Sequence, residues 1–404
     1  MFTPDRASGL ARLEAFLPQA GRAYAHRRNT DLGPGNHDHV SRLSPWLRHR
    51  LVLEREVLQA VLDRHGLQAA EKFVDEVFWR SYFRGWMAHH ASAWTLYRQA
   101  VSEAREAAES DAGLATRLAD AEAGRTGNAA VDAWARELIE TGYLHNHARM
   151  WFASLWIFTL RLPWALGADF FLRHLLDGDP ASNTLSWRWV GGLHTRGKIY
   201  LARRDNVLRF TDGRIDPGDG IVTHAEPLTE SVPPERTGIA WPEPAVTGRH
   251  PAWLVTEEDC RADGLLPASA KFHFGLVASR ARSPLAPARA VCEFSEGAVR
   301  DALGRAGAPE APCFGGSNAG LEALVQELST NGVDAVHVAW PPYGPVADTL
   351  RPLALRLHEA GVALCWHVRD LDRAAWPFAD RGFFKLKKKI PALLRAFDRE
   401  RIDA

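Results

Sequence analysis

Cysteine is scarce in this sequence, and neither sign of charge is in excess. The four cysteines all lie after residue 259, with no CxxC spacing and no accompanying histidine pattern. This distribution argues against a disulfide framework and against a zinc site. The 49 basic residues are balanced by 49 acidic residues, so any surface that binds nucleic acid must be local.

A membrane-spanning segment and a secretory signal are not expected either. Residues 150–160 are uncharged, but Arg161 and Pro163 follow, and this stretch is too short to cross a bilayer. The first residues, MFTPDRASGL, lack a basic stretch followed by an apolar one. The sequence therefore predicts a cytoplasmic protein with neither a membrane partner nor a bound metal.

The chain is long enough for two domains, and its periodicity changes once. Up to about residue 225 the apolar spacing is mostly helical. Prolines become frequent between Pro217 and Pro251, which marks a linker at residues 226–250. Short apolar runs then alternate with helical stretches, and this alternation predicts a parallel sheet; the runs are residues 252–256, 272–278, 335–340 and 362–368. We therefore predict an α-helical domain at residues 1–225, followed by a smaller α/β domain at residues 251–404.

Residues 141–200 are the most informative segment. They combine helical spacing and many aromatic residues with Asp177, Asp179 and Asn183. An unsatisfied buried polar group costs a few kcal/mol, so something polar must satisfy these side chains. We expect a bound cofactor to do so.

Five ordered motifs resemble the flavin-binding domain of the DNA photolyase/cryptochrome family. They are SRLSPWL at residues 41–47, EVFWR at 76–80, GRTG at 124–127, TGYLHNHARM at 141–150 and DGDPASNTLSWRW at 177–189. The resemblance covers roughly residues 20–215 and implies an α-helical FAD-binding domain. Residues 343–364 are loosely similar to the family's α/β antenna domain, which in the family precedes the helical one, so the order here would be permuted.

The resemblance implies FAD as cofactor and leaves a second, antenna chromophore unknown. It assigns the following residues to FAD binding: Tyr24, Ser41, Arg42, Leu43, Ser44, Phe73, Arg80, Asn146, Arg149, Asp177, Asp179 and Asn183. In the family the loop at residues 41–47 holds the flavin diphosphate, and a helix start suits an anion. Alternatively, Ser41 or Ser44 is a simple N-cap.

The resemblance also assigns a substrate set. Glu76, Trp79, Asn146, Met150 and Trp189 would hold a pyrimidine dimer that has left the duplex of damaged DNA. The branch of the family that repairs (6-4) photoproducts has histidines at the positions of Asn146 and Met150. The residues found here resemble the branch that repairs cyclobutane dimers.

Catalytic roles are implied for Glu76, Asn183, Trp187 and Trp164. Asn183 matches the position beside flavin N5, where an amide tunes the chemistry of the ring. Asparagine there is typical of photolyases. Trp187 and Trp164 resemble the first two members of a tryptophan relay that reduces the flavin in light.

The resemblance therefore implies light-dependent repair of cyclobutane dimers, with basic side chains at residues 186–210 holding phosphates. Two alternatives stay open: a cryptochrome-like blue-light photoreceptor with a protein partner, and a redox flavoprotein that has lost DNA binding. Val40 and His147 replace a threonine and an arginine common in the family. No tryptophan lies between Trp94 and Trp134 to act as the outer relay member.

Overall fold

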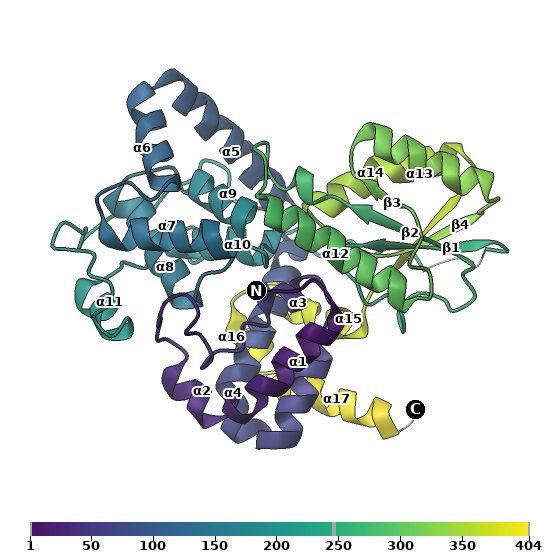
Figure 1. Ribbon diagram of the computed structural model, residues 1–404, viewed down its shortest axis with the longest axis horizontal. Helices are drawn as coiled ribbons and strands as arrows, with labels where there is room; N and C mark the ends of the chain where they lie inside the picture. The colour runs from purple at the N-terminus through teal and green to yellow at the C-terminus, as the bar shows by residue number, and fades with distance from the viewer. Residues whose placement is uncertain (1, 245–247, 403–404) are drawn as a thin grey trace.

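The computed structural model describes residues 2–244 and 248–402, and it joins a helical part to a five-stranded sheet (Figure 1). The helices before the sheet are α1 (Arg6–Phe16), α2 (Arg22–Arg27), α3 (Ser44–Arg48), α4 (Glu54–His89), α5 (Ser92–Ser110), α6 (Ala112–Glu122), α7 (Ala129–Thr141), α8 (Asn146–Ser154), α9 (Trp164–His174), α10 (Pro180–Val190) and α11 (Arg204–Phe210). A π-helical turn, Leu155–Thr159, continues α8. Among the described helices, none is both long and apolar enough to cross a membrane.

Helix α4 is the longest element and carries one wall of the candidate site. Gly66 interrupts it with a φ of 69° and a ψ of 163°, a conformation that is essentially restricted to glycine and costs other residues about 1–3 kcal/mol. The second half of α4 buries Val74 and Phe78 in the core. Residues three and four apart share one face of a helix, so Glu76, Trp79 and Arg80 lie together beside a cavity.

Large aromatic side chains fill the core around α7, α8, α9 and α10. The fully buried ones include Trp134, Trp151, Phe152, Trp156, Phe170, Phe171 and Trp187. Aromatic side chains bury large areas and prefer offset or edge-on contacts, as in the stacked pair Trp134 and Trp151, whose ring centroids are 5.6 Å apart. This packing makes the helical framework behind the site rigid.

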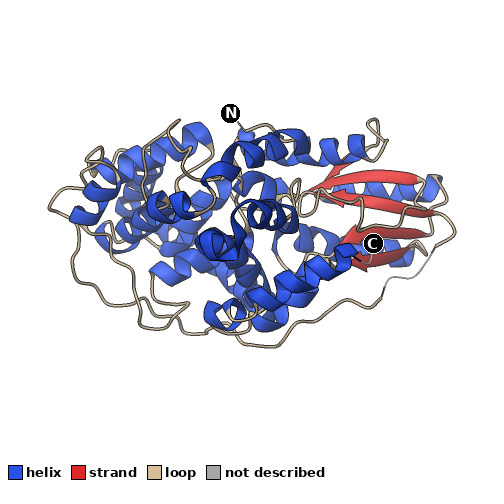
Figure 2. Cartoon of the chain, turned by 90° about the horizontal axis from the view of Figure 1, so that it is seen from below, coloured by secondary structure: helices blue, strands red, loops and turns tan. Residues whose placement is uncertain are grey.

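The sheet is parallel throughout, and helices cover both of its faces (Figures 1 and 2). Its strands, in the order β3-β2-β1-β4-β5, are β1 (Pro251–Thr256), β2 (Phe272–Val277), β3 (Cys313–Gly315), β4 (Ala335–Ala339) and β5 (Ala363–His367). Leu254 packs against α13 (Asn318–Thr330) and α14 (Gly344–Glu359). Its chain neighbours Trp253 and Val255 face the core shared with α12 (Arg289–Arg305). This arrangement confirms the predicted fold class.

The chain returns to the helical part after β5. Helices α15 (Asp370–Ala375), α16 (Phe383–Lys387) and α17 (Ile390–Ile402) complete it, and α15 and α16 lie against α4 (Figure 1). Trp376 and Leu386 are buried in the same core as α4. The region predicted as α/β, residues 251–404, therefore includes a terminal segment that packs on the helical part. The domain division itself stays a prediction.

Buried ion pairs join the sheet to the helical part. They lie at the carboxyl ends of β1 and β4, where the strand order reverses and where open α/β sheets usually bind ligands. The Nη2 atom of Arg48 is 2.6 Å from Oε1 of Glu258, and Nη1 of Arg50 is 3.3 Å from Oδ2 of Asp259. At this edge, burial raises the pKa of Glu257 to about 7. Charged side chains of the helical part thus fill this end of the sheet.

The proline-rich linker runs along the helical part before it reaches the sheet (Figure 2). Glu230 accepts two hydrogen bonds from the guanidinium of Arg188, each 2.8 Å long. The N–H of Thr237 donates to the carbonyl of His89 at 2.9 Å. The linker is therefore attached to the helical part at Glu230 and at Thr237.

Candidate functional site

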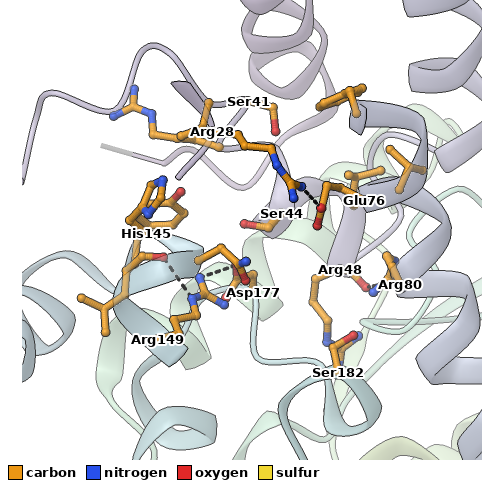
Figure 3. Close-up of a pocket in the computed structure, with 18 of the residues that line it drawn as sticks. Arg28, Ser41, Ser44, Arg48, Glu76, Arg80, His145, Arg149, Asp177 and Ser182 are labelled. Atoms are coloured by element: carbon orange, nitrogen blue, oxygen red, sulfur yellow. Dashed lines mark hydrogen bonds and ion pairs between the residues drawn. The ribbon is translucent and has the colours of Figure 1, made fainter. Parts of the chain in front are cut away.

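Two adjoining cavities lie among α4, α8 and α10. The smaller has a volume of about 250 Å³ and is shown in Figure 3. The larger has about 510 Å³, within the range of about 300–1,000 Å³ that is usual for ligand pockets. The residues that line both are Glu76, Arg80, Asn146, Arg149, Asp177, Asp179 and Ser182.

Most of the predicted FAD-binding residues come together at the smaller cavity. Those that line it are Tyr24, Ser41, Arg42, Ser44, Phe73, Arg80, Asn146, Arg149, Asp177 and Asp179. Asn183 lines the larger cavity instead. Leu43 is fully buried and lines neither of these cavities. The structure thus brings together segments that are more than 150 positions apart in the sequence.

Helices α8 and α10 begin at the site, and local capping fixes both starts. Nδ1 of His145 accepts a hydrogen bond from the N–H of His147 at the start of α8. Oδ1 of Asp179 accepts from the N–H groups of Ala181 and Ser182 at 3.1 and 2.9 Å, as an aspartate N-cap does. The caps orient α8 and α10 so that their first turns face the cavities.

The two aspartates predicted to contact the cofactor differ in how many of their carboxylate oxygens already accept a hydrogen bond. Oδ2 of Asp179 binds Arg80 at 3.0 Å, so both oxygens of this carboxylate are engaged. Oδ2 of Asp177 accepts from Arg149 at 2.8 Å. Oδ1 of Asp177 is buried and makes no hydrogen bond with the described residues. A ligand with a hydrogen-bond donor would satisfy it.

The pKa of Asp179 shows how strongly cations surround this aspartate. Burial alone would raise the pKa, but Arg80, Arg84 and Arg48 together lower it below the ordinary value. Asp179 is therefore ionised at neutral pH and fixes Arg80 at the boundary of the two cavities.

The loop before α3 presents hydroxyl groups to the smaller cavity. Arg42 has a φ of 52°, a conformation that is sparsely populated for residues other than glycine and that occurs often at functional sites. Leu43 stands at the N-cap position of α3, and its side chain accepts no hydrogen bond. Oγ of Ser41 accepts a hydrogen bond from the N–H of Leu43 at 3.3 Å. Neither Ser41 nor Ser44 therefore occupies the N-cap position of α3 in this structure. Both serines line the cavity.

Glu76 forms an ion pair with Arg28 at the edge of the smaller cavity (Figure 3). Burial raises the pKa of Glu76, although the guanidinium of Arg28 opposes this shift. A carboxyl group with a raised pKa keeps its proton to higher pH. Burial thus favours the protonated form of Glu76, and the ion pair with Arg28 favours the ionised form.

The predicted substrate residues line the larger cavity. Glu76, Trp79, Asn146, Met150 and Trp189 all face it, together with the predicted catalytic residues Asn183 and Trp187. Nδ2 of Asn183 donates to the carbonyl of Ala168 at 2.7 Å. The two substrate-side indoles are supported from behind: Trp79 stacks on Phe383, and Trp189 on Tyr200. The sequence analysis assigned no role to Phe383.

Trp187 lies between the larger cavity and the aromatic core. Its ring is edge-on to that of Trp156, with centroids 6.2 Å apart, and to that of Phe171 at 5.1 Å. The ring of Trp164 lies near Tyr97 instead, at 6.0 Å. No direct ring contact joins Trp164 to Trp187 in the described part of the chain. The place of Trp164 in a relay stays a prediction.

The basic segment at residues 186–210 is largely paired with acids. Arg188 is buried and bound to Glu230, Arg203 is 2.6 Å from Asp205, and Arg204 is 2.6 Å from Asp216. Exposed cations without an ion pair to a described residue include Arg196 and Lys198. If this surface holds phosphates, Arg196, Lys198 and the exposed Arg209 are available among the described residues of this segment.

Several cavity residues were missed by the sequence analysis. They include Arg28, Arg48, His145, Ser182 and Phe384. Arg48 directly follows the SRLSPWL motif, so extending that motif by one residue could have found it. Phe384 lies far from every motif, and nothing in the sequence indicates that it reaches the cavity.

Comparison with known proteins identifies the helical region. The model of the FAD binding domain of DNA photolyase matches residues 73–235. A deoxyribodipyrimidine photo-lyase of Streptomyces griseus is 32% identical over 222 residues, which are 52% of this chain and 46% of that protein. A deoxyribodipyrimidine photo-lyase of Thermus thermophilus is 35% identical over 207 residues, 51% and 47% of the two chains. A cryptochrome DASH of Gloeobacter violaceus is 30% identical over 246 residues, 59% and 47%.

Two solved structures are also similar. A cryptochrome of Synechocystis sp. PCC6803 matches with a TM-score of 0.44 and 24% identity, covering 52% of this chain and 43% of that one. A class III photolyase of Agrobacterium tumefaciens matches with a TM-score of 0.40 and 26% identity, covering 51% and 44%.

The matched region is helical, and its family model is one of an FAD-binding domain. More narrowly, residues 73–235 match the FAD binding domain of DNA photolyase, and about half of this chain is similar to deoxyribodipyrimidine photo-lyases and to a cryptochrome DASH. The chain spans about half the length of the curated relatives that it matches.

Proposed function

We propose that this protein is a light-dependent DNA repair flavoprotein that splits cyclobutane pyrimidine dimers. One observation carries the proposal: the larger cavity places the predicted dimer-holding residues Trp79, Met150 and Trp189 around the same space as Asn183 and Trp187. Cofactor and substrate would therefore meet in one site, as electron transfer between them requires. The relatives named deoxyribodipyrimidine photo-lyase support the same function.

The residues present fit FAD. Asp177 offers a buried, unsatisfied acceptor, and Ser41, Ser44 and Arg28 offer hydroxyls and a cation suited to a diphosphate. Asn183 has its amide nitrogen bound to Ala168, and its Oδ1 makes no hydrogen bond within the described ranges. Reduced FAD, when bound and excited by light, supplies the electron that opens the cyclobutane ring. The protein's part is to hold, orient and shield the reactants.

The walls of the larger cavity are suited to a pair of joined pyrimidines. Indole rings such as Trp79 and Trp189 can stack on bases regardless of sequence. Glu76 and Asn146 carry donors and acceptors for the base edges, and Met150 supplies an adaptable apolar surface. A flipped dimer would exchange the duplex stack for these contacts.

Replacing Asp177 with alanine is expected to weaken FAD retention. The change removes the unpaired acceptor and leaves the partly buried Arg149 without its carboxylate. Loss of such an interaction costs about 1–3 kcal/mol, or roughly five- to 150-fold in Kd. FAD released on heating, measured per polypeptide, and reconstitution titrations report the change. Asp205→Ala, which removes an exposed carboxylate, serves as control; equal FAD content in both variants would contradict the assignment of Asp177.

The decisive test of the function is repair of a single-stranded oligonucleotide that contains one cyclobutane thymine dimer. The reduced protein should restore intact thymines in blue light and not in darkness. Trp79→Ala should weaken the preference for damaged over intact DNA by about 1–3 kcal/mol, the value of one base stack, and Glu76→Ala should also weaken it. Both should keep their FAD. Glu103→Ala on α5, which removes an exposed carboxylate, is the control.

A cryptochrome-like photoreceptor is the second candidate. The pairing of Arg188, Arg203 and Arg204 with acids of this chain favours it, because those cations are then not free for phosphates. The relative from Gloeobacter violaceus is named Cryptochrome DASH. A photoreceptor would show equal affinity for damaged and intact strands and no loss of dimers in light.

A further inference from the structure

Helix α16 brings two consecutive phenylalanines to the larger cavity in different ways. Phe383 is 5% exposed and stacks on the indole of Trp79, with ring centroids 4.0 Å apart and planes 12° apart. Phe384 is 73% exposed and lines the cavity. Helix α16 therefore supplies part of the cavity wall from outside the matched family region, residues 73–235.

Ion pairs and packing hold α16 in place against α4. Nζ of Lys387 is 2.6 Å from Oδ2 of Asp75 and 3.0 Å from Oε1 of Glu71. Nζ of Lys385 is 2.5 Å from Oδ1 of Asp380, and Leu386 is fully buried. These contacts fix the orientation of α16, so the ring of Phe384 is held at the cavity and cannot turn into the core.

The surroundings of Phe384 distinguish it from an ordinary exposed apolar residue. A single such residue on a surface needs no explanation, but this ring borders the space assigned to the flipped dimer. Arg381 and Lys388 lie close to it in the sequence, are exposed, and pair with no acid among the residues described. An aromatic ring flanked by cations is the combination that binds single-stranded nucleic acid without reading its sequence.

We propose that Phe384 is a DNA-contacting residue: its ring stacks on a nucleobase of the lesion-bearing strand beside the dimer, while Arg381 and Lys388 contact phosphates of that strand. This inference rests on the proposed repair function and extends its substrate site to a helix after the α/β domain. The stacked base belongs to the damaged strand because the ring shares its cavity with Trp79. The acids that contact α16 are paired with its own lysines: Asp380 with Lys385, and Asp75 and Glu71 with Lys387.

Binding of a fluorescent, dimer-containing single-stranded oligonucleotide tests the proposal. Phe384→Ala should weaken binding about fivefold or more, the loss expected for one base stack, while Phe384→Trp should retain it. Lys388→Ala should lower the slope of log K against log salt concentration by about 0.7, since one phosphate contact is lost. Leu355→Ala, at a residue 66% exposed on α14, and Lys271→Ala, at an exposed cation beside β2, should bind as the wild type does.

The outcomes separate this inference from the function on which it rests. Unchanged binding by Phe384→Ala, in a wild-type background that repairs dimers, overturns only the role of Phe384. Equally weak binding by Phe384→Ala and Phe384→Trp overturns the stacking contact. A wild-type protein that neither prefers damaged DNA nor repairs it overturns both proposals. FAD content and thermal melting of each variant confirm that it is folded.

Discussion

Replacing Trp187 with phenylalanine is expected to slow light-driven reduction of bound FAD about tenfold or more, which corresponds to at least about 1.4 kcal/mol in the barrier. Trp187 lines the larger cavity and is buried against Trp156 and Phe171. A benzene ring is much harder to oxidise than indole, so the variant keeps the packing but loses the electron donor. The decay of oxidised-flavin absorption in blue light, with an external reductant present, measures the rate.

Trp366→Phe on β5 is the matched control, because it removes an indole from the sheet rather than from the cavity. Equal photoreduction by wild type and Trp187→Phe would show that Trp187 passes no electron. If Trp187→Phe slows the reduction, Trp156→Phe and Trp164→Phe identify the next member of the relay. We expect Trp164→Phe to reduce its flavin more slowly than Trp156→Phe does, because Trp164 is partly exposed whereas Trp156 is fully buried.

Replacing Arg50 with alanine is expected to destabilise the protein by about 3–5 kcal/mol, the usual cost of removing one partner from a buried ion pair. The guanidinium of Arg50 is 2.6 Å from Asp372, 3.3 Å from Asp259 and 3.6 Å from Glu54, and all three carboxylates are buried. Burial alone would lower the pKa of Arg50, but these carboxylates raise it well above its ordinary value. The variant would leave them without that cation.

Urea unfolding followed by tryptophan fluorescence measures this loss. Arg203→Ala removes a cation whose ion pair with Asp205 is exposed on both sides, so it should change the free energy of unfolding by no more than about 1 kcal/mol. A loss as small for Arg50→Ala as for Arg203→Ala would mean that the junction between sheet and helices does not depend on this network.

The parts of this structure that follow from local patterns could be predicted from the sequence. The four apolar runs became β1, β2, β4 and β5, because a buried parallel strand needs a continuous apolar segment. The strand β3, Cys313–Gly315, was missed because three residues carry no such pattern. Most of the FAD-binding residues that were predicted from the ordered motifs likewise line one cavity.

Contacts between distant segments could not be predicted in this way. Arg188 belongs to a basic run and was expected to face phosphates, but its partner Glu230 lies 42 positions away. Phe383 and Phe384 lie in a short helix, FFKLK, whose composition does not indicate a contact with Trp79. Which surface such a helix covers depends on the whole fold, so its contact with Trp79 became visible only in the structure.

The return of α16 to α4 has a consequence for how the protein is made. Lys387 and its partner Asp75 are separated by 312 positions in the chain. At about 5–20 residues per second, the ribosome needs roughly 15–60 s between the synthesis of one and of the other. During that interval Trp79 has no Phe383 against it. The helical part therefore lacks the cavity wall that α16 supplies until the whole α/β domain has been synthesised. Dependence on chaperones should be greatest during that interval.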